Sequence, residues 1–180
     1  MSTVSGKLVT AEELMAMGDI GPCELVRGEV RRLSPVGFRH ARVTAALTEL
    51  LRVFVRSSDL GVVLAGEVGF VLTRDPDTVR AADVAFLSKE RLAGVSDEGY
   101  IPFAPDLAVE IVSPGNAWTQ IEEKVRDYLA AGTRMVWVID PSIPAAYIHR
   151  PGSLAKRIGP SDELSGEDVL PGFAVKLADL

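Results

Sequence analysis

The chain has little that would tie it to a membrane or to an oxidising compartment. Its 180 residues include one cysteine, Cys23, which cannot form an internal disulfide. No apolar run approaches the ~20 residues of a membrane helix. Acidic residues also interrupt the N-terminal region where a signal peptide has its apolar stretch. The sequence therefore predicts a cytoplasmic protein that does not associate with membranes and whose stability comes from packing.

Several familiar sequence features are also absent. There is no internal repeat, low-complexity tract or linker, and no glycine-rich phosphate loop or zinc-binding pattern. Ser113 lacks the flanking glycines of a nucleophile elbow, and Cys23 has no paired histidine in the pattern of a thiol protease. With 47% hydrophobic and 24% charged residues, the composition is typical of a folded chain with one core. We expect a single domain over residues 1–180.

Charge is distributed unevenly along the chain. The formal net charge is -6, but the excess of cations is densest between Arg27 and Arg56, where seven arginines face only Glu29 and Glu49. Such a patch can meet phosphates even in an acidic protein. Charge alone is equally compatible with the solvated face of a hairpin and a helix.

The N-terminal third has clear local signals. Thr10 and Glu13 have the spacing of a capping box, which predicts a short helix ending near Met17. Gly28 separates two β-rich runs, which predicts a hairpin because glycine supplies the positive φ of a tight turn. Apolar residues then recur at helical spacing over 38–55, which predicts the longest helix.

The remaining two thirds alternate strand and helix patterns. Short β-rich runs are expected at 62–64, 68–72 and 83–87. The nearly continuous apolar run 106–112 is typical of a central strand covered on both faces. A helix at 121–129 and a buried strand at 135–139 complete a βαβ unit with a parallel pair, and the tail from Ala145 to Leu180 reads as a β meander. These patterns predict an α+β domain.

Two acidic residues are out of place in this pattern. Glu110 lies in the middle of the apolar run, where an unpaired carboxylate would cost several kcal/mol to desolvate. A partner arginine is one explanation. Asp83 opens a strand that is predicted to be buried, and two acids on neighbouring strands can converge on one divalent cation. Their hard oxygen ligands suit Mg²⁺ or Mn²⁺.

Lys124 is a third candidate. It lies at the margin of the apolar stripe of the 121–129 helix, so its ammonium can reach back toward the end of the Glu110 strand. The alternative is an ordinary exposed lysine on a solvated helix.

Taken in order along the chain, several segments resemble the Uma-two family of restriction-endonuclease-like proteins, which belongs to the PD-(D/E)XK nuclease superfamily. The resemblance runs from about Thr10 to Leu180 and depends on CELVRGE at 23–29, FRH at 38–40, DVAF at 83–86, PDLAVEIVSP at 105–114, KVRDY at 124–128 with Gly132, VWVIDP at 136–141 and LPGF at 170–173.

The resemblance implies a restriction-endonuclease-like core: a mixed central β-sheet flanked by helices, with an N-terminal hairpin and a C-terminal β meander. It also implies a metal-dependent DNA endonuclease in which Asp83 and Glu110 hold Mg²⁺ or Mn²⁺. The superfamily lysine is expected two residues after the glutamate, where Val112 stands, so Lys124 becomes its carrier. Ala82 stands where a proline usually precedes the aspartate, a departure that leaves the acid pair and the lysine intact.

Supporting roles are expected for Glu24, His40 and Glu67. Glu24 is a possible ligand from the hairpin or a cross-strand partner of Arg31, and Glu67 is either an outer acid of the site or half of a surface pair. His40 matches a family position near the start of the long helix, where it would contact nucleic acid together with Arg39 and Arg42. Without the resemblance, His40 reads as a surface histidine.

Two functions remain open from the sequence. The first is an endonuclease that hydrolyses phosphodiester bonds in DNA, with Lys124 assisting the attacking water or the transition state. The second is a catalytically inactive relative that binds nucleic acid or a partner protein. A homodimer is expected for the endonuclease, because a symmetric pair of sites is the usual way to cut both strands.

Overall fold

The computed structural model describes residues 8–113 and 117–180. Its helices are α1 (Ala11–Ala16), α2 (Phe38–Ser57), α3 (Lys89–Leu92), α4 (Trp118–Ala130) and a final 3₁₀ turn, η1 (Leu177–Asp179). Its strands are β1 (Cys23–Val26), β2 (Glu29–Arg32), β3 (Gly61–Thr73), β4 (Thr78–Ser88), β5 (Leu107–Ile111), β6 (Met135–Asp140), β7 (Ala145–His149), β8 (Lys156–Ile158), β9 (Glu163–Ser165) and β10 (Ala174–Lys176).

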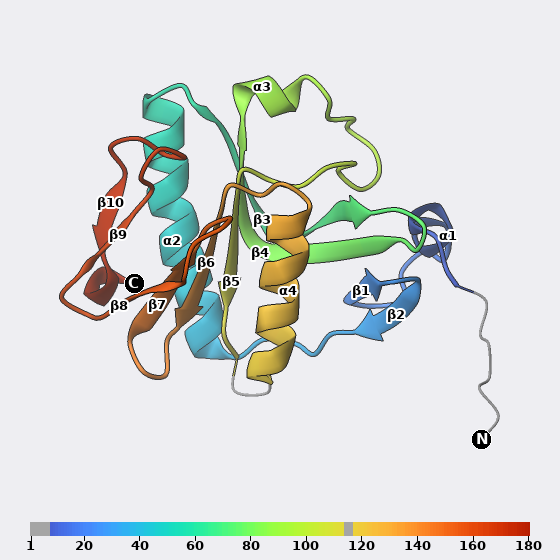
Figure 1. Ribbon diagram of the computed structural model, residues 1–180, viewed down its shortest axis with the longest axis horizontal. Coiled ribbons are helices and arrows are strands. Elements are labelled where there is room, and N and C mark those ends of the chain that lie inside the picture. Colours follow the sequence, from blue (N-terminus) through green and yellow to red (C-terminus); the bar gives the residue numbers. More distant parts are fainter. Residues whose placement is uncertain (1–7, 114–116) are drawn as a thin grey trace.

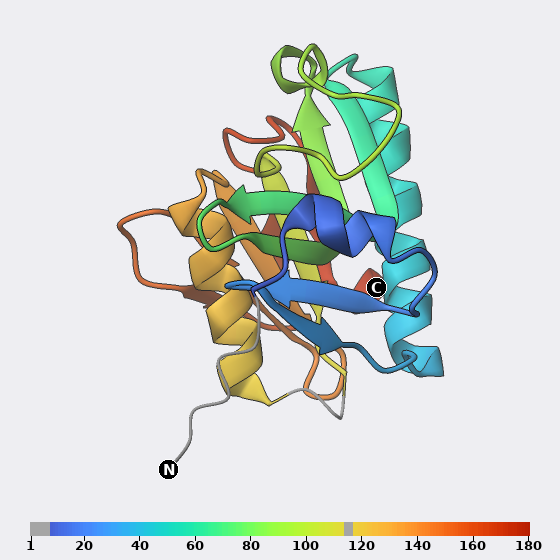
Figure 2. The same ribbon diagram turned by 90° about the vertical axis from the view of Figure 1, so that its right-hand side faces the viewer.

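The strands β1 to β8 form one mixed sheet between two long helices. The order is β2-β1-β4-β5-β6-β7-β8, and β3 pairs with the other edge of β4. Among the paired strands of the described residues, only β5 and β6 are parallel, and α4 follows β5 and precedes β6, which confirms the predicted βαβ unit. The two views show α2 on one face of the sheet and α4 on the other (Figures 1 and 2). The expected α+β architecture is therefore present.

The local signals of the N-terminal region are confirmed. The Thr10 hydroxyl accepts from the Glu13 amide, and the Glu13 carboxylate accepts from the Thr10 amide, which completes the capping box of α1. Strands β1 and β2 form an antiparallel hairpin in which Arg27 and Gly28 both have positive φ. Glycine adopts this conformation without steric cost.

Two segments are built differently from the expected pattern. The runs at 62–64 and 68–72 belong to the single strand β3, because the break between Ala65 and Val68 is a β-bulge and not a turn. Both Gly66 and Glu67 have positive φ at this bulge. In the tail, β7 and β8 extend the main sheet, whereas β9 and β10 form a separate two-stranded ribbon.

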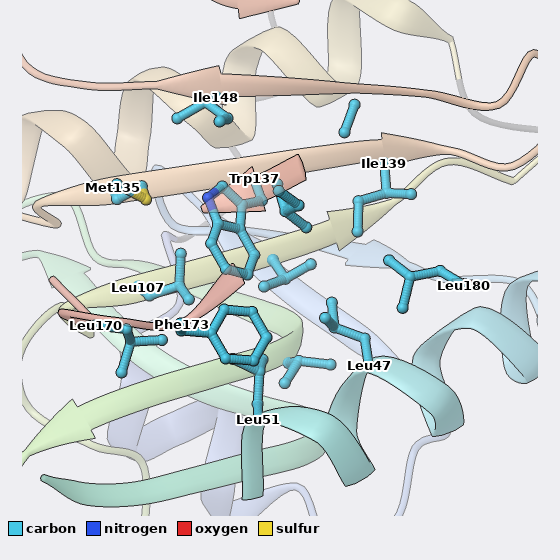
Figure 3. Close-up of a cluster of buried hydrophobic side chains, with 14 of the residues drawn as sticks. Leu47, Leu51, Leu107, Met135, Trp137, Ile139, Ile148, Leu170, Phe173 and Leu180 are labelled. Atoms are coloured by element: carbon cyan, nitrogen blue, oxygen red, sulfur yellow. The ribbon is translucent and has the colours of Figure 1, made fainter. Parts of the chain in front are cut away.

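The core is divided by the sheet into two layers. On the α2 face, Trp137 stacks on Phe173 with ring centroids 6.0 Å apart, above Leu47 and Leu51 of α2 (Figure 3). On the α4 face lies a second buried cluster that includes Tyr128. In the described part of the chain, no helix is both long enough and apolar enough to cross a membrane.

Strand β5 distributes its residues between these layers. Val109 and Ile111 belong to the α2 layer and Ala108 to the α4 layer, because successive side chains of a strand point to opposite faces. Glu110 consequently points toward α4.

Candidate active site

The two acids predicted to act together come from adjacent antiparallel strands. The pairing of β4 with β5 ends at Val84 and Val109, so Asp83 and Glu110 are the next residues of the two strands at that end. The Ile111 amide donates a hydrogen bond to Oδ2 of Asp83 at 2.7 Å, which ties the end of β5 to this carboxylate. Both acids line one cleft of about 390 Å³.

Lys124 reaches the same place from α4. Its ammonium donates to Oε2 of Glu110 at 2.6 Å and to the Ala81 carbonyl at 3.0 Å, and lies 3.0 Å from Oε1 of Glu24. Its side chain is 13% exposed, so the alternative of an ordinary solvated lysine is wrong. The compensating partner of Glu110 is this lysine and not an arginine.

Glu24 is fully engaged by its neighbours. Its Oε1 accepts from the Ala81 amide at 2.9 Å, and its Oε2 accepts from Arg80 at 2.9 Å. Although Glu24 and Arg31 are register partners in the hairpin, Arg31 donates to Glu123 at 2.6 Å. The prediction that Glu24 is a cross-strand partner of Arg31 is therefore confirmed by the register, although the two side chains bind other residues, and Glu24 also lines the cleft.

Arg80 is the residue of this cluster that sequence reasoning missed. It is buried in β4 and binds Glu24 on one side, and on the other its Nε donates to Asp127 of α4 at 2.8 Å. Burial opposes its charge, but Glu24 and Asp127 raise the pKa of Arg80 above its ordinary value. Its position within the β-rich run of residues 78–87 could have identified it, because a charged residue in a predicted buried strand needs a partner, as Glu110 does.

His40 contacts the other acid. Its Nε2 lies 3.1 Å from Oδ2 of Asp83, and its Nδ1 lies 3.3 Å from the hydroxyl of Thr44, one helical turn further along α2. The Thr44 hydroxyl also donates to the His40 carbonyl at 2.9 Å. The ring is buried, so the reading of His40 as a surface residue is wrong. Because Asp83 contacts α2 and Glu110 contacts α4, the site lies where both helices meet the sheet.

The remaining predicted residues are placed less centrally. Glu67 is an exposed residue of the bulge in β3, opposite Asp83, and lines the cleft. Arg39 and Arg42 are exposed on α2 outside the cleft lining, and Arg39 lies 3.5 Å from the Pro141 carbonyl. The arginines that line the cleft besides Arg80 are Arg31 and Arg32 of the hairpin.

Burial and neighbouring charges act in opposite directions on the ionisation of Glu110, Lys124 and Glu24. It raises the pKa of Glu110 to about 8, against the opposing charge of Lys124 and with the added repulsion of Asp83. Burial also opposes the charge of Lys124, but Glu110 and Glu24 raise the pKa of that ammonium above its ordinary value. For Glu24, Lys124 and Arg80 outweigh burial and lower the pKa of the carboxyl.

The carboxylates of the cleft are candidate ligands for a divalent metal. In residues 8–113 and 117–180, no group of three or more histidine, cysteine or acidic side chains lies close enough to hold a metal by itself. Within the same residues, Oε1 of Glu110 is buried and has no hydrogen-bond partner. Mg²⁺ is often held by one or two carboxylates, with waters and substrate phosphates as its other ligands. Two carboxylates with one unsatisfied oxygen fit that pattern.

A mixed sheet between two helices, with two acids and a lysine lining one cleft, defines a restriction-endonuclease-like protein. The chain belongs to the Uma2 family, whose model, described as "Putative restriction endonuclease", matches residues 11–178. Five solved chains match it. One is the crystal structure of "a putative nuclease belonging to DUF820" from Anabaena variabilis ATCC 29413. It is 19% identical, with a TM-score of 0.83 over 95% of this chain and 96% of that chain. No curated protein matches the chain. The resemblance predicted from the sequence is thus confirmed.

Proposed function

We propose that this protein is a Mg²⁺-dependent DNA endonuclease, with Mn²⁺ as an alternative ion. The observation that carries the proposal is the convergence of Asp83, Glu110 and Lys124 on one cleft, where Glu110 has a buried Oε1 without a hydrogen-bond partner in the described residues. A buried polar atom without a partner costs about 1–3 kcal/mol, so such atoms are usually satisfied by something that binds. Membership of a nuclease family supports the same chemistry.

Asp83 and Glu110 would hold the cation. A divalent ion bound there lowers the pKa of a water and neutralises charge on a scissile phosphate. The ammonium of Lys124 lies against Glu110, where it can orient the attacking water or stabilise negative charge in the transition state.

Three further residues would keep these groups in place. Glu24 binds the ammonium of Lys124, and Arg80 and the Ala81 amide in turn hold the carboxylate of Glu24 in place. His40 supports Asp83 from α2. Neither oxygen of Glu24 is left without a partner, which favours a positioning role for Glu24 over a role as metal ligand.

DNA would approach the cleft past its cationic rim. Arg31 and Arg32 line the cleft on the hairpin side, and Arg39 and Arg42 are exposed at the start of α2. Phosphate contacts from such residues position a nucleic acid without reading its sequence.

Cleavage of supercoiled plasmid and of single-stranded circles in Mg²⁺ or Mn²⁺ tests the proposal. Wild type and the control Glu122→Ala, which removes an exposed acid of α4, are expected to cut. Asp83→Ala and Glu110→Ala are expected to lose about a hundredfold in rate or more. Cutting by all four proteins at the same rate would reject the site.

A second candidate is the inactive binding module. It is favoured by the finding that no three metal-binding side chains cluster in the described part of the chain. It predicts no heat of Mg²⁺ binding by calorimetry and no cleavage with any cation, together with retained binding of DNA or a partner protein.

A further inference from the structure

Strand β3 has a free edge over its first half. On one side it pairs with β4 along its length. On the other side, the Val71 amide donates to the Ile101 carbonyl and the Ile101 amide to the Gly69 carbonyl, so that part of the edge is covered. In the described residues, no strand pairs with the outer edge of Gly61–Ala65. An uncovered edge is a template for another strand.

A groove of about 1080 Å³ runs beside this free edge, between β3 and α2. Figure 2 shows the two elements side by side. Helix α2 lines the groove with small side chains, which leaves room for an extended chain: Ala41, Thr44, Ala45 and Thr48. Strand β3 contributes Val62, Val63 and Ala65, and Val53 of α2, also in the lining, is 65% exposed.

The charges of the groove argue against nucleic acid as its occupant. Its arginines are Arg52 and Arg56. Its acidic residues outnumber them and are Glu49, Asp59, Glu67 and Asp83. A phosphate backbone needs a cationic surface, so an acidic groove with an apolar floor and a strand edge is suited to a polypeptide strand.

The charges of the groove are complementary to those of a second copy of the chain. Glu49 and Arg56 lie two helical turns apart on α2, with Arg52 between them. The chain reverses direction after Ser57, so β3 runs back along α2. A helix rises about 1.5 Å per residue and a strand about 3.3 Å. Counted from this reversal, Val63 of β3 and Arg52 of α2 therefore lie at about the same distance along the groove. A twofold axis at this level brings Glu49 of one copy opposite Arg56 of the partner subunit, and the converse.

We propose that the groove between α2 and β3 is a homodimer interface, in which Gly61–Ala65 of two copies pair as antiparallel strands about a twofold axis near Val63. The eight-stranded sheets of the two copies then become continuous. The pairing satisfies the free backbone groups of β3 and buries Val53.

This interface would also set the distance between the two candidate active sites, a consequence that rests on the proposed function. The groove shares His40, Glu67 and Asp83 with the catalytic cleft. Val63 pairs with Phe86, three residues along β4 from Asp83. At about 3.3 Å per residue, the two Asp83 residues are separated by about 20 Å along the strands. Two sites on one continuous surface suit cleavage of both strands of one duplex.

Sedimentation velocity at micromolar concentrations tests the interface without any cleavage assay. Wild type is expected to be a dimer. Ala45→Arg fills the groove from an exposed helical position and is expected to be a monomer with an unchanged circular dichroism spectrum. The matched control is Ala130→Arg, which changes an exposed alanine of α4 and is expected to remain a dimer.

Charge reversal tests the symmetry. Glu49→Arg and Arg56→Glu each place like charges in two equivalent contacts, so each is expected to weaken the dimer at least about tenfold. The double variant restores opposite charges and is expected to return to within about threefold of wild type.

Two results would overturn the interface: a monomeric wild type, or a dimer that Ala45→Arg leaves intact. If the wild type is monomeric and Ala45→Arg weakens its binding to a DNA duplex, the groove is assigned to nucleic acid instead. Because the readout is mass and not cleavage, an inactive dimer would refute the proposed function while leaving the interface in place.

Discussion

Replacing Glu110 by glutamine is expected to stabilise this protein at alkaline pH. Glu110 is 3% exposed, with one carboxylate oxygen bound to Lys124 and the other without a hydrogen-bond partner in the described residues. Burial raises the pKa of this carboxyl from 4.5 to about 8. The folded protein therefore holds the Glu110 proton more tightly than the unfolded chain does throughout that interval.

The sign of the effect follows from proton linkage. The contribution of Glu110 to the free energy of unfolding is fully present below pH 4.5 and is lost as the pH rises through about 8. The loss is at most about 1.4 kcal/mol per pH unit, so it reaches a few kcal/mol at the upper end. Glutamine has a similar volume and no proton to release. In Glu110→Gln, Lys124 keeps Glu24 and the Ala81 carbonyl as partners.

Urea unfolding of the metal-free proteins, followed by circular dichroism across this pH range, measures the effect. Glu110→Gln and wild type are expected to be equally stable near pH 4.5 and to diverge as the pH approaches 8, with the variant more stable. Glu122→Gln, which changes an exposed acid of α4, serves as the control and is expected to follow wild type. A variant that is less stable than wild type at pH 8 would refute the reasoning. It would mean that Lys124 stabilises an ionised Glu110.

Three other predictions concern the same cluster. Because Mg²⁺ must displace the Glu110 proton, the apparent affinity of the protein for Mg²⁺, measured by calorimetry, is expected to rise by up to about tenfold per pH unit below pH 8. An affinity that does not change with pH would mean that Glu110 is not a ligand. Glu24→Gln is expected to slow cleavage at least about tenfold while Mg²⁺ affinity stays within about twofold of wild type, because Glu24 acts through Lys124. A loss of Mg²⁺ affinity in this variant would show that Glu24 is a metal ligand. Arg80→Met removes the partner of Oε2 of the buried Glu24 and is expected to cost about 3 kcal/mol or more in urea unfolding. Lys89→Met, at the exposed pair with Asp59, is expected to cost less than about 1 kcal/mol, and similar losses in the two variants would contradict the burial argument.

Much of the fold was predictable because its signals are local. The capping box of Thr10, the hairpin at Gly28 and the βαβ unit depend on residue spacing within a few turns or strands, and the structure contains all three. The sequence pattern predicted two separate β-rich runs at 62–64 and 68–72, because Gly66 and Glu67 resemble a turn, whereas β3 continues through a bulge at these residues. Pairing with β4 keeps the strand continuous there, and that pairing is not visible in the β3 sequence itself.

The candidate site was predicted in outline but not in its connections. Glu110 and Lys124 were identified because a charged residue in or beside an apolar pattern needs a compensating partner. Arg80 was missed because its partners, Glu24 and Asp127, lie 56 and 47 residues away in the chain. The contact between His40 and Asp83 spans 43 residues and has no local signature.

The sequence by itself determined the order of the elements, the two core faces and the presence of charged groups that have to be paired, because periodicity and burial are properties of neighbouring residues. Only the tertiary structure decided which charges meet. The Ile111 amide at the end of β5 binds the Asp83 carboxylate beside Glu110, and the packing of α4 brings Lys124 to both glutamates. Pairing between distant segments also left the outer edge of Gly61–Ala65 without a strand in the described residues, since β4 pairs with only one side of β3.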